Sequence, residues 1–202
     1  MKEALNLGTL YLSRRDSNYN DRNYTLHTFE LVVDTLHSLE KAKPTANLLL
    51  PFIHIICFDA WIANTDRHQE NWGIISSLES DNLRLAPLYD PAACLGAELQ
   101  DHHSLLLQTA DYELRVKRYI ANCKSGFGDN TQLMLMSQLV EEARLTDIWQ
   151  SHVENWLSTF SSMMIQIRSY IEGLPVEWLP LPRKELAITL LERRLAWLQE
   201  RR

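Results

Sequence analysis

A long apolar run, "ANLLLPFIHIICFDAWIAN" at residues 46–64, limits the folds that this chain can adopt. The run is about as long as a membrane-spanning helix, but Pro51, His54 and Asp59 fall inside it. A membrane helix needs ~20 mostly apolar residues, and a charged side chain at its centre is costly. We therefore predict a helix buried in a protein core, from about Pro51 to Ala63.

Apolar residues at helical spacing predict further helices on both sides of this run. They are expected at residues 25–43, 111–123, 131–145, 147–174 and 183–202, with Thr25 capping the first and a loop at 124–128. Apolar runs at 72–77 and 83–89 flank the turn-forming "LESDN", and "TLYLS" at 9–13 has the pattern of a short strand. The predicted fold is mainly α with one small β-hairpin.

Charge and cysteine content exclude several classes of protein. Lys and Arg number 20 against 26 Asp and Glu, a formal net charge of -6, so an anion site would have to be local. The three cysteines are far apart and form no CxxC pair, which argues against a disulfide framework and a zinc site. The N-terminal residues lack a signal-peptide pattern. We expect a cytoplasmic protein with no direct nucleic-acid partner and no membrane partner.

Polar residues crowd into "NTDRHQENWG" at 64–73, directly after the buried helix. Asp66 and Asn71 lie five residues apart, and the predicted hairpin follows before "LYDPAACLG" at 88–96. A hairpin carries the chain out and back, so it would return Asp90 beside the loop that bears Asn71. This order of a carboxylate, an amide and a second carboxylate is what phosphoryl transfer from ATP requires.

Each of these side chains has an expected role. Asp66 would orient the acceptor hydroxyl and take its proton. Asn71 and Asp90 would hold Mg²⁺ against the nucleotide phosphates, because Mg²⁺ prefers oxygen ligands and keeps few from the protein. His68 could hydrogen-bond the Asp66 carboxylate or reach the transferred phosphoryl group. Arg67 is expected to be structural and to pair with a nearby carboxylate.

The stretches "FDAWIANTDRHQENWGII" and "LRLAPLYDPAACLG" resemble the C-terminal lobe of HipA-like serine/threonine kinases of bacterial toxin–antitoxin modules. The resemblance implies a catalytic Asp66, a metal-binding Asn71, and Asp90 as the counterpart of the Asp in the DFG triplet of kinases. The cofactors would be ATP and Mg²⁺. "DHHSLLL" is also similar to a stretch of this family, although His102 and His103 are expected to form only a surface pair.

The domain division follows from this resemblance. Residues 1–24 would form a hinge-like strand and loop, and residues 25–202 the helical domain with its catalytic loop at 64–73 and metal-binding segment at 88–96. The resemblance implies a C-lobe without the β-rich N-lobe, because the sequence has neither a glycine-rich phosphate loop nor a lysine on a strand before Asp66. The chain could be part of a longer kinase, half of a split kinase, or a degenerate relative.

The leading hypothesis is a HipA-like kinase domain that transfers the ATP γ-phosphate to a hydroxyl of a protein substrate when an N-lobe is supplied. Its partners would be the substrate and either a separate N-lobe or an antitoxin-like protein. The alternative is a catalytically silent interaction domain. A lipid kinase and a metal-dependent phosphohydrolase are two weaker readings. Residues that contact the nucleotide base, and the identity of the substrate, are not predicted.

Overall fold

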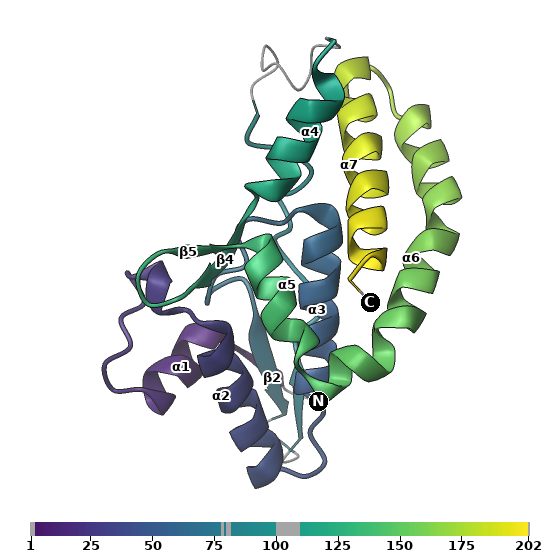
Figure 1. Ribbon diagram of the computed structural model, residues 1–202. Coiled ribbons are helices and arrows are strands. Elements are labelled where there is room, and N and C mark those ends of the chain that lie inside the picture. The colour runs from purple at the N-terminus through teal and green to yellow at the C-terminus, as the bar shows by residue number, and fades with distance from the viewer. Residues whose placement is uncertain (1–2, 78, 80–81, 100–109, 202) are drawn as a thin grey trace.

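The structure, a computed structural model, describes residues 3–77, 79, 82–99 and 110–201. Helices dominate this part of the chain, as predicted (Figure 1). The α-helices are α1 (Gly8–Arg15), α2 (Phe29–Ala42), α3 (Leu49–Ile62), α4 (Tyr112–Ala121), α5 (Met136–Arg144), α6 (Asp147–Gly173) and α7 (Leu181–Gln199). The shorter elements are β1 (Glu3–Leu7), the 3-10 helix η1 (Tyr24–Leu26), β2 (Gly73–Ser77), β3 (Leu83–Leu85), β4 (Lys124–Gly128) and β5 (Leu133–Leu135).

Helix α3 runs through the middle of the molecule, and α2, α5, α6 and α7 all pack against it (Figure 1). Its buried residues lie on every side of the helix, which is typical of a helix enclosed by others. The predicted buried helix is therefore confirmed, with its start two residues before Pro51. It ends at Ile62, and the backbone of the next residue, Ala63, adopts the left-handed conformation (φ 57°) and turns the chain into the 64–73 loop.

The predicted hairpin is also confirmed, as antiparallel strands β2 and β3. A third strand, β1, pairs with the other edge of β2 and places Leu7 opposite Gly73. The strand predicted at "TLYLS" is wrong, because those residues lie in α1. The backbone N–H groups of Gly8 and Thr9 donate to carbonyls of the 64–73 loop, and these tertiary bonds begin the helix where local alternation indicated a strand.

Strands β4 and β5 form a second antiparallel hairpin, which the sequence reading missed. Residues 124–128 are a strand and not a loop, and the helix predicted from 131 begins only at Met136. The helix predicted from residue 25 likewise begins at Phe29. Its cap is the side chain of Thr28, which accepts a hydrogen bond from Leu31 N, because residues 24–26 form η1.

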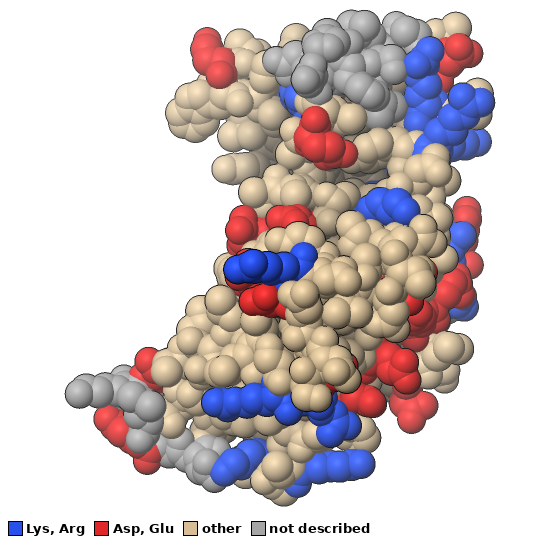
Figure 2. All heavy atoms as spheres, turned by 90° about the vertical axis from the view of Figure 1, so that its left-hand side faces the viewer, with Lys and Arg blue, Asp and Glu red and all other residues tan. Residues whose placement is uncertain are grey.

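The surface charge is mixed over the face drawn in Figure 2. Acidic and basic side chains lie side by side over its middle, and Lys and Arg gather at its lower end, where Figure 1 places α1 and α2. Helix α1 ends with Arg14 and Arg15, and α2 carries Lys41 in its last turn. Of the helices described here, none is long and apolar enough to cross a membrane.

Candidate active site

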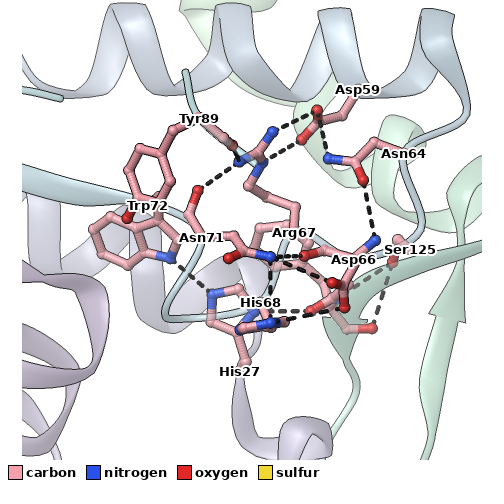
Figure 3. Close-up of polar contacts among 12 residues, drawn as sticks. His27, Asp59, Asn64, Asp66, Arg67, His68, Asn71, Trp72, Tyr89 and Ser125 are labelled. Carbon is pink, nitrogen blue, oxygen red and sulfur yellow. Dashed lines mark hydrogen bonds and ion pairs between the residues drawn. The ribbon is translucent and has the colours of Figure 1, made fainter. Parts of the chain in front are cut away.

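The 64–73 loop is anchored to α3 by a buried ion pair (Figure 3). Arg67 donates from Nε to Oδ2 of Asp59 at 2.7 Å and from Nη2 to Oδ1 at 3.0 Å, and both side chains are almost fully buried. Asn64 Nδ2 donates a third bond to this carboxylate. Burial raises the pKa of Asp59, while the bonds from Arg67 and Asn64 oppose that rise. The expectation that Arg67 is structural and pairs with a carboxylate is confirmed.

The third nitrogen of Arg67 connects the loop to the segment after the hairpin. Its Nη1 donates to the backbone carbonyl of Asn71 and, at 2.9 Å, to that of Tyr89. The hydroxyl of Tyr89 donates to the carbonyl of Glu70 at 2.8 Å. One buried guanidinium therefore contacts α3, the loop and the residue that precedes Asp90. The backbone just before Asp90 therefore lies beside the loop, and the meeting of Asp90 with Asn71 stays a prediction.

Asp66, His68 and Asn71 converge on one side of the loop (Figure 3). Asn71 Nδ2 donates to the carbonyl of Asp66 at 2.7 Å and lies 3.4 Å from its Oδ2. His68 Nε2 lies 3.7 Å from the other carboxylate oxygen, Oδ1. The side chain of Asp66 is 54% exposed. The carboxylate is thus oriented by its neighbours and remains open to a molecule arriving from solvent.

The amide of Asn71 is oriented by the same contacts. Its nitrogen faces the backbone of Asp66, and its oxygen Oδ1 accepts no hydrogen bond from the described residues. A neutral oxygen held in this way is a suitable ligand for a hard cation. The side chain is 6% exposed, so its rotamer is set by the protein.

The segment that carries Asp90 is fastened at several points. Thr65 N donates to the carbonyl of Ala93 at 3.0 Å, and Leu95 N donates to that of Ile62 at 2.8 Å. Asp90 itself is exposed and has a left-handed backbone (φ 49°), which is uncommon for a residue other than glycine. A local conformation of this kind is kept only where the surrounding contacts hold it.

Gly126 of β4 and the buried His27 support the 64–73 loop, and this support was not predicted. The backbone of Gly126 lies directly against that of Arg67, so an added Cβ would be 2.4 Å from Arg67 N. His27 is fully buried between these elements; Trp72 Nε1 donates to its Nε2 at 3.0 Å, and its Nδ1 bonds to the Gly126 carbonyl at 2.9 Å. Because Nε2 accepts, Nδ1 carries the proton. Burial lowers the pKa of His27 to about 4.

One part of this support could have been found in the sequence. Asp59 is a carboxylate inside an apolar helix, eight residues before Arg67, and a buried acid requires a partner. His27 and Gly126 gave no comparable signal, because their contacts join segments far apart in the chain. His102 and His103 lie outside the described residues.

The helical domain, with a small sheet and a loop bearing Asp, His and Asn, defines a protein-kinase-like C-lobe. The HipA-like C-terminal domain family matches residues 6–158, and the chain belongs to that family. Over 103 residues it is 29% identical to the serine/threonine-protein kinase CtkA of Helicobacter pylori strain J99, an alignment that covers 40% of this chain and 32% of that kinase. A crystal structure of a Helicobacter pylori proinflammatory kinase CtkA has the same fold, with a TM-score of 0.68 and 17% identity; the match covers 97% of this chain and 68% of that one.

Proposed function

We propose that this chain forms the catalytic C-terminal lobe of an ATP- and Mg²⁺-dependent protein kinase that phosphorylates a serine or threonine hydroxyl. The observation that carries the proposal is the convergence of Asp66, His68 and Asn71 on one loop, with Tyr89, the residue before Asp90, bonded to Arg67 of that loop. In this proposal residues 1–24 are the hinge-like part, and residues 25–202 are the kinase C-terminal domain.

Asp66 would act on the acceptor. Its exposed carboxylate takes the proton as the hydroxyl oxygen forms a bond to the γ-phosphorus, while the bond from that phosphorus to the bridging oxygen of ADP breaks. His68 Nε2 faces the same carboxylate and would help to orient it. The proton ends on Asp66, and ADP leaves with the bridging oxygen.

Asn71 and Asp90 would hold the metal ion. The Oδ1 of Asn71, which accepts no hydrogen bond from the described residues, and the exposed carboxylate of Asp90 could both donate oxygen to a metal, which fits Mg²⁺. When bound, Mg²⁺ would neutralise negative charge on the nucleotide phosphates. The protein's own contribution would be to hold the backbone at these two donors, because Arg67 donates to the carbonyl of Asn71 and to that of Tyr89, which precedes Asp90.

The nucleotide phosphates also require a protein lobe as a cover. We propose that a β-rich N-lobe supplies it, either from the same polypeptide or from a separate one. The outer face of β1 is a suitable contact surface, because Leu5 and Leu7 are 53% and 39% exposed there and Leu7 pairs with Gly73 at the end of the loop. An antitoxin-like protein is the other proposed partner.

The test combines this chain with a β-rich N-lobe, ATP and Mg²⁺, and follows transfer of phosphate to protein. Asp66→Asn should lower the rate by about 10²- to 10⁴-fold, the usual contribution of a positioned base. Glu154→Gln, which removes an exposed carboxylate on α6, should leave the rate unchanged. An unchanged rate in Asp66→Asn would show that Asp66 is not the base.

Calorimetry separates this function from the silent interaction domain. With the N-lobe present, the chain should bind Mg²⁺ and ATP together, and Asp90→Asn should weaken that binding much more than Glu154→Gln does. If no binding of the metal–nucleotide complex is detected, the interaction-domain hypothesis is favoured.

A further inference from the structure

A tyrosine that the sequence reading did not single out lies against His68. The ring of Tyr24 is stacked on the His68 imidazole, with centroids 5.2 Å apart and planes 26° apart. Tyr24 is 46% exposed, so its ring contributes little to the core, whereas the His68 side chain beneath it is only 16% exposed. The stack covers the one loop residue whose ring faces the Asp66 carboxylate.

The backbone around Tyr24 is fixed to the β4–β5 hairpin. Asn23 Oδ1 accepts from the backbone N of Thr25 and so caps η1. The carbonyl of Thr25 accepts from Asn130 N at 3.0 Å, and Gly128 is packed so closely that an added Cβ would lie 2.1 Å from that carbonyl oxygen. Tyr24 is therefore held by the β4–β5 hairpin, which also contacts the 64–73 loop at Arg67. Its position relative to His68 is determined by these contacts.

The contacts of the His68 imidazole show how Tyr24 affects the orientation of the ring. The ring is contacted at both nitrogens, because Glu70 N donates to His68 Nδ1 at 3.2 Å and Asn71 Nδ2 lies 3.2 Å from Nε2. Nε2 also lies 3.7 Å from Oδ1 of Asp66, so the edge of the ring that carries it faces the carboxylate. Tilting the plane of the ring about its χ2 angle would move Nε2 away from Asp66. Stacking on Tyr24 opposes that rotation.

We propose that Tyr24 is a positioning residue, which holds the His68 ring so that its Nε2 faces Asn71 and Asp66. The inference rests on the proposed function, because it assigns that orientation a part in phosphoryl transfer. Aromatic stacking changes a conformational preference by a factor of about three to ten. The rate of transfer should depend on Tyr24 to the same extent, through kcat and not through the KM for ATP.

The experiment compares Tyr24→Leu and Tyr24→Phe with Tyr170→Leu, which removes an exposed tyrosine of α6. Nitrogen-15 NMR of His68 in the 202-residue chain reports the surroundings of its two ring nitrogens, without ATP or an N-lobe. The wild type, Tyr24→Phe and Tyr170→Leu should show the same pair of ring-nitrogen shifts, and Tyr24→Leu shifts averaged over several ring orientations. With the N-lobe added, only Tyr24→Leu should lose about three- to tenfold in kcat.

The proposal is overturned if Tyr24→Leu leaves the His68 signals as in the wild type, or if Tyr24→Phe fails to restore them. Phosphate transfer that is absent from the wild type as well would count against the proposed function alone, since the NMR measurement is made without catalysis.

Discussion

Arg67 is the single side chain on which the geometry of the site depends most. It neutralises the buried Asp59 and donates to two carbonyls, one on the 64–73 loop and one beside Asp90. Arginine suits this position because its planar fork can bond a carboxylate with two nitrogens and still direct a third nitrogen elsewhere. Its loss should affect both stability and the placement of the proposed metal ligands.

Arg67→Met keeps most of the side-chain volume but leaves Asp59 without its cation. Removing one partner of a buried ion pair costs about 3–5 kcal/mol, and we expect the free energy of unfolding in urea to fall by that amount. Arg193→Met is the matched control, since Arg193 pairs with Glu113 at the surface and its loss should cost less than about 1 kcal/mol. Equal losses in the two variants would contradict the role given to Arg67.

His27 predicts how stability changes with pH. Its pKa is about 4 in the folded protein and 6.5 for an ordinary histidine, so as pH falls the unfolded chain takes up the proton first. The contribution of neutral His27 is complete above about pH 6.5 and is lost as pH falls towards 4, by about 3 kcal/mol in total. The free energy of unfolding, measured from pH 7 to 4, should fall more steeply in the wild type than in His27→Gln. If the free energy of unfolding depends on pH in the same way in both proteins, the role given to His27 is wrong.

At the scale of elements, the β4–β5 hairpin has the largest effect on the site. Its glycines are required by close approach: Gly126 contacts the backbone of Arg67, and Gly128 that of Thr25. A side chain at either position would separate the hairpin from the 64–73 loop or from the segment bearing Tyr24. The hairpin therefore sets the position of two parts of the site that it does not itself belong to.

Gly126→Ala should lower the free energy of unfolding by about 1–3 kcal/mol and also reduce phosphate transfer, because the added Cβ must displace backbone atoms. Gly173→Ala provides the comparison: it lies at the end of α6 with no atom near its added Cβ, and alanine there should raise stability by about 0.4–1 kcal/mol. Denaturant unfolding of both variants measures the difference. If Gly126→Ala is as stable as the wild type, the hairpin can move without disturbing the loop.

The β4–β5 hairpin is one of the elements that could not be predicted from the sequence. Helix α3, the β2–β3 hairpin and the convergence of Asp66, His68 and Asn71 were predictable, because each depends on local periodicity, turn residues or a short motif, whereas the place of Asp90 in that group stays a prediction. Strand β1 pairs with residues about 70 positions away, and α1 begins where tertiary hydrogen bonds hold Gly8 and Thr9. The glycines at 126 and 128 resemble loop residues until their packing partners are known. These elements depend on contacts between residues far apart in the sequence, and no local sequence pattern indicates such contacts.

At the scale of the whole molecule, burial is distributed unevenly among the helices. The main hydrophobic cluster joins α3 to residues of α1, α2, α5, α6 and α7. Within the part of the chain described, α4 belongs to a smaller cluster, in which Val116 packs with Leu186 and Leu190 of α7. Val116 is the one buried residue of α4, whereas α5 buries four residues in the main cluster. The two helices have similar lengths but very different shares of the core.

Hydrogen exchange should show this difference directly. Isolated helices of this length are marginal in water, so the protection of their amides comes from packing. Because α4 can separate from α7 without opening the main cluster, its amides should exchange on the order of a hundredfold faster than those of α5, although α5 is one residue shorter. Amides of α3 should be the slowest, since they are exposed only when the whole cluster opens.

Hydrogen exchange measured by NMR at constant pH tests this prediction. Equal protection of α4 and α5 would mean that α4 unfolds only together with the core. In that case the region around the proposed active site and the α4–α7 end would form one cooperative unit.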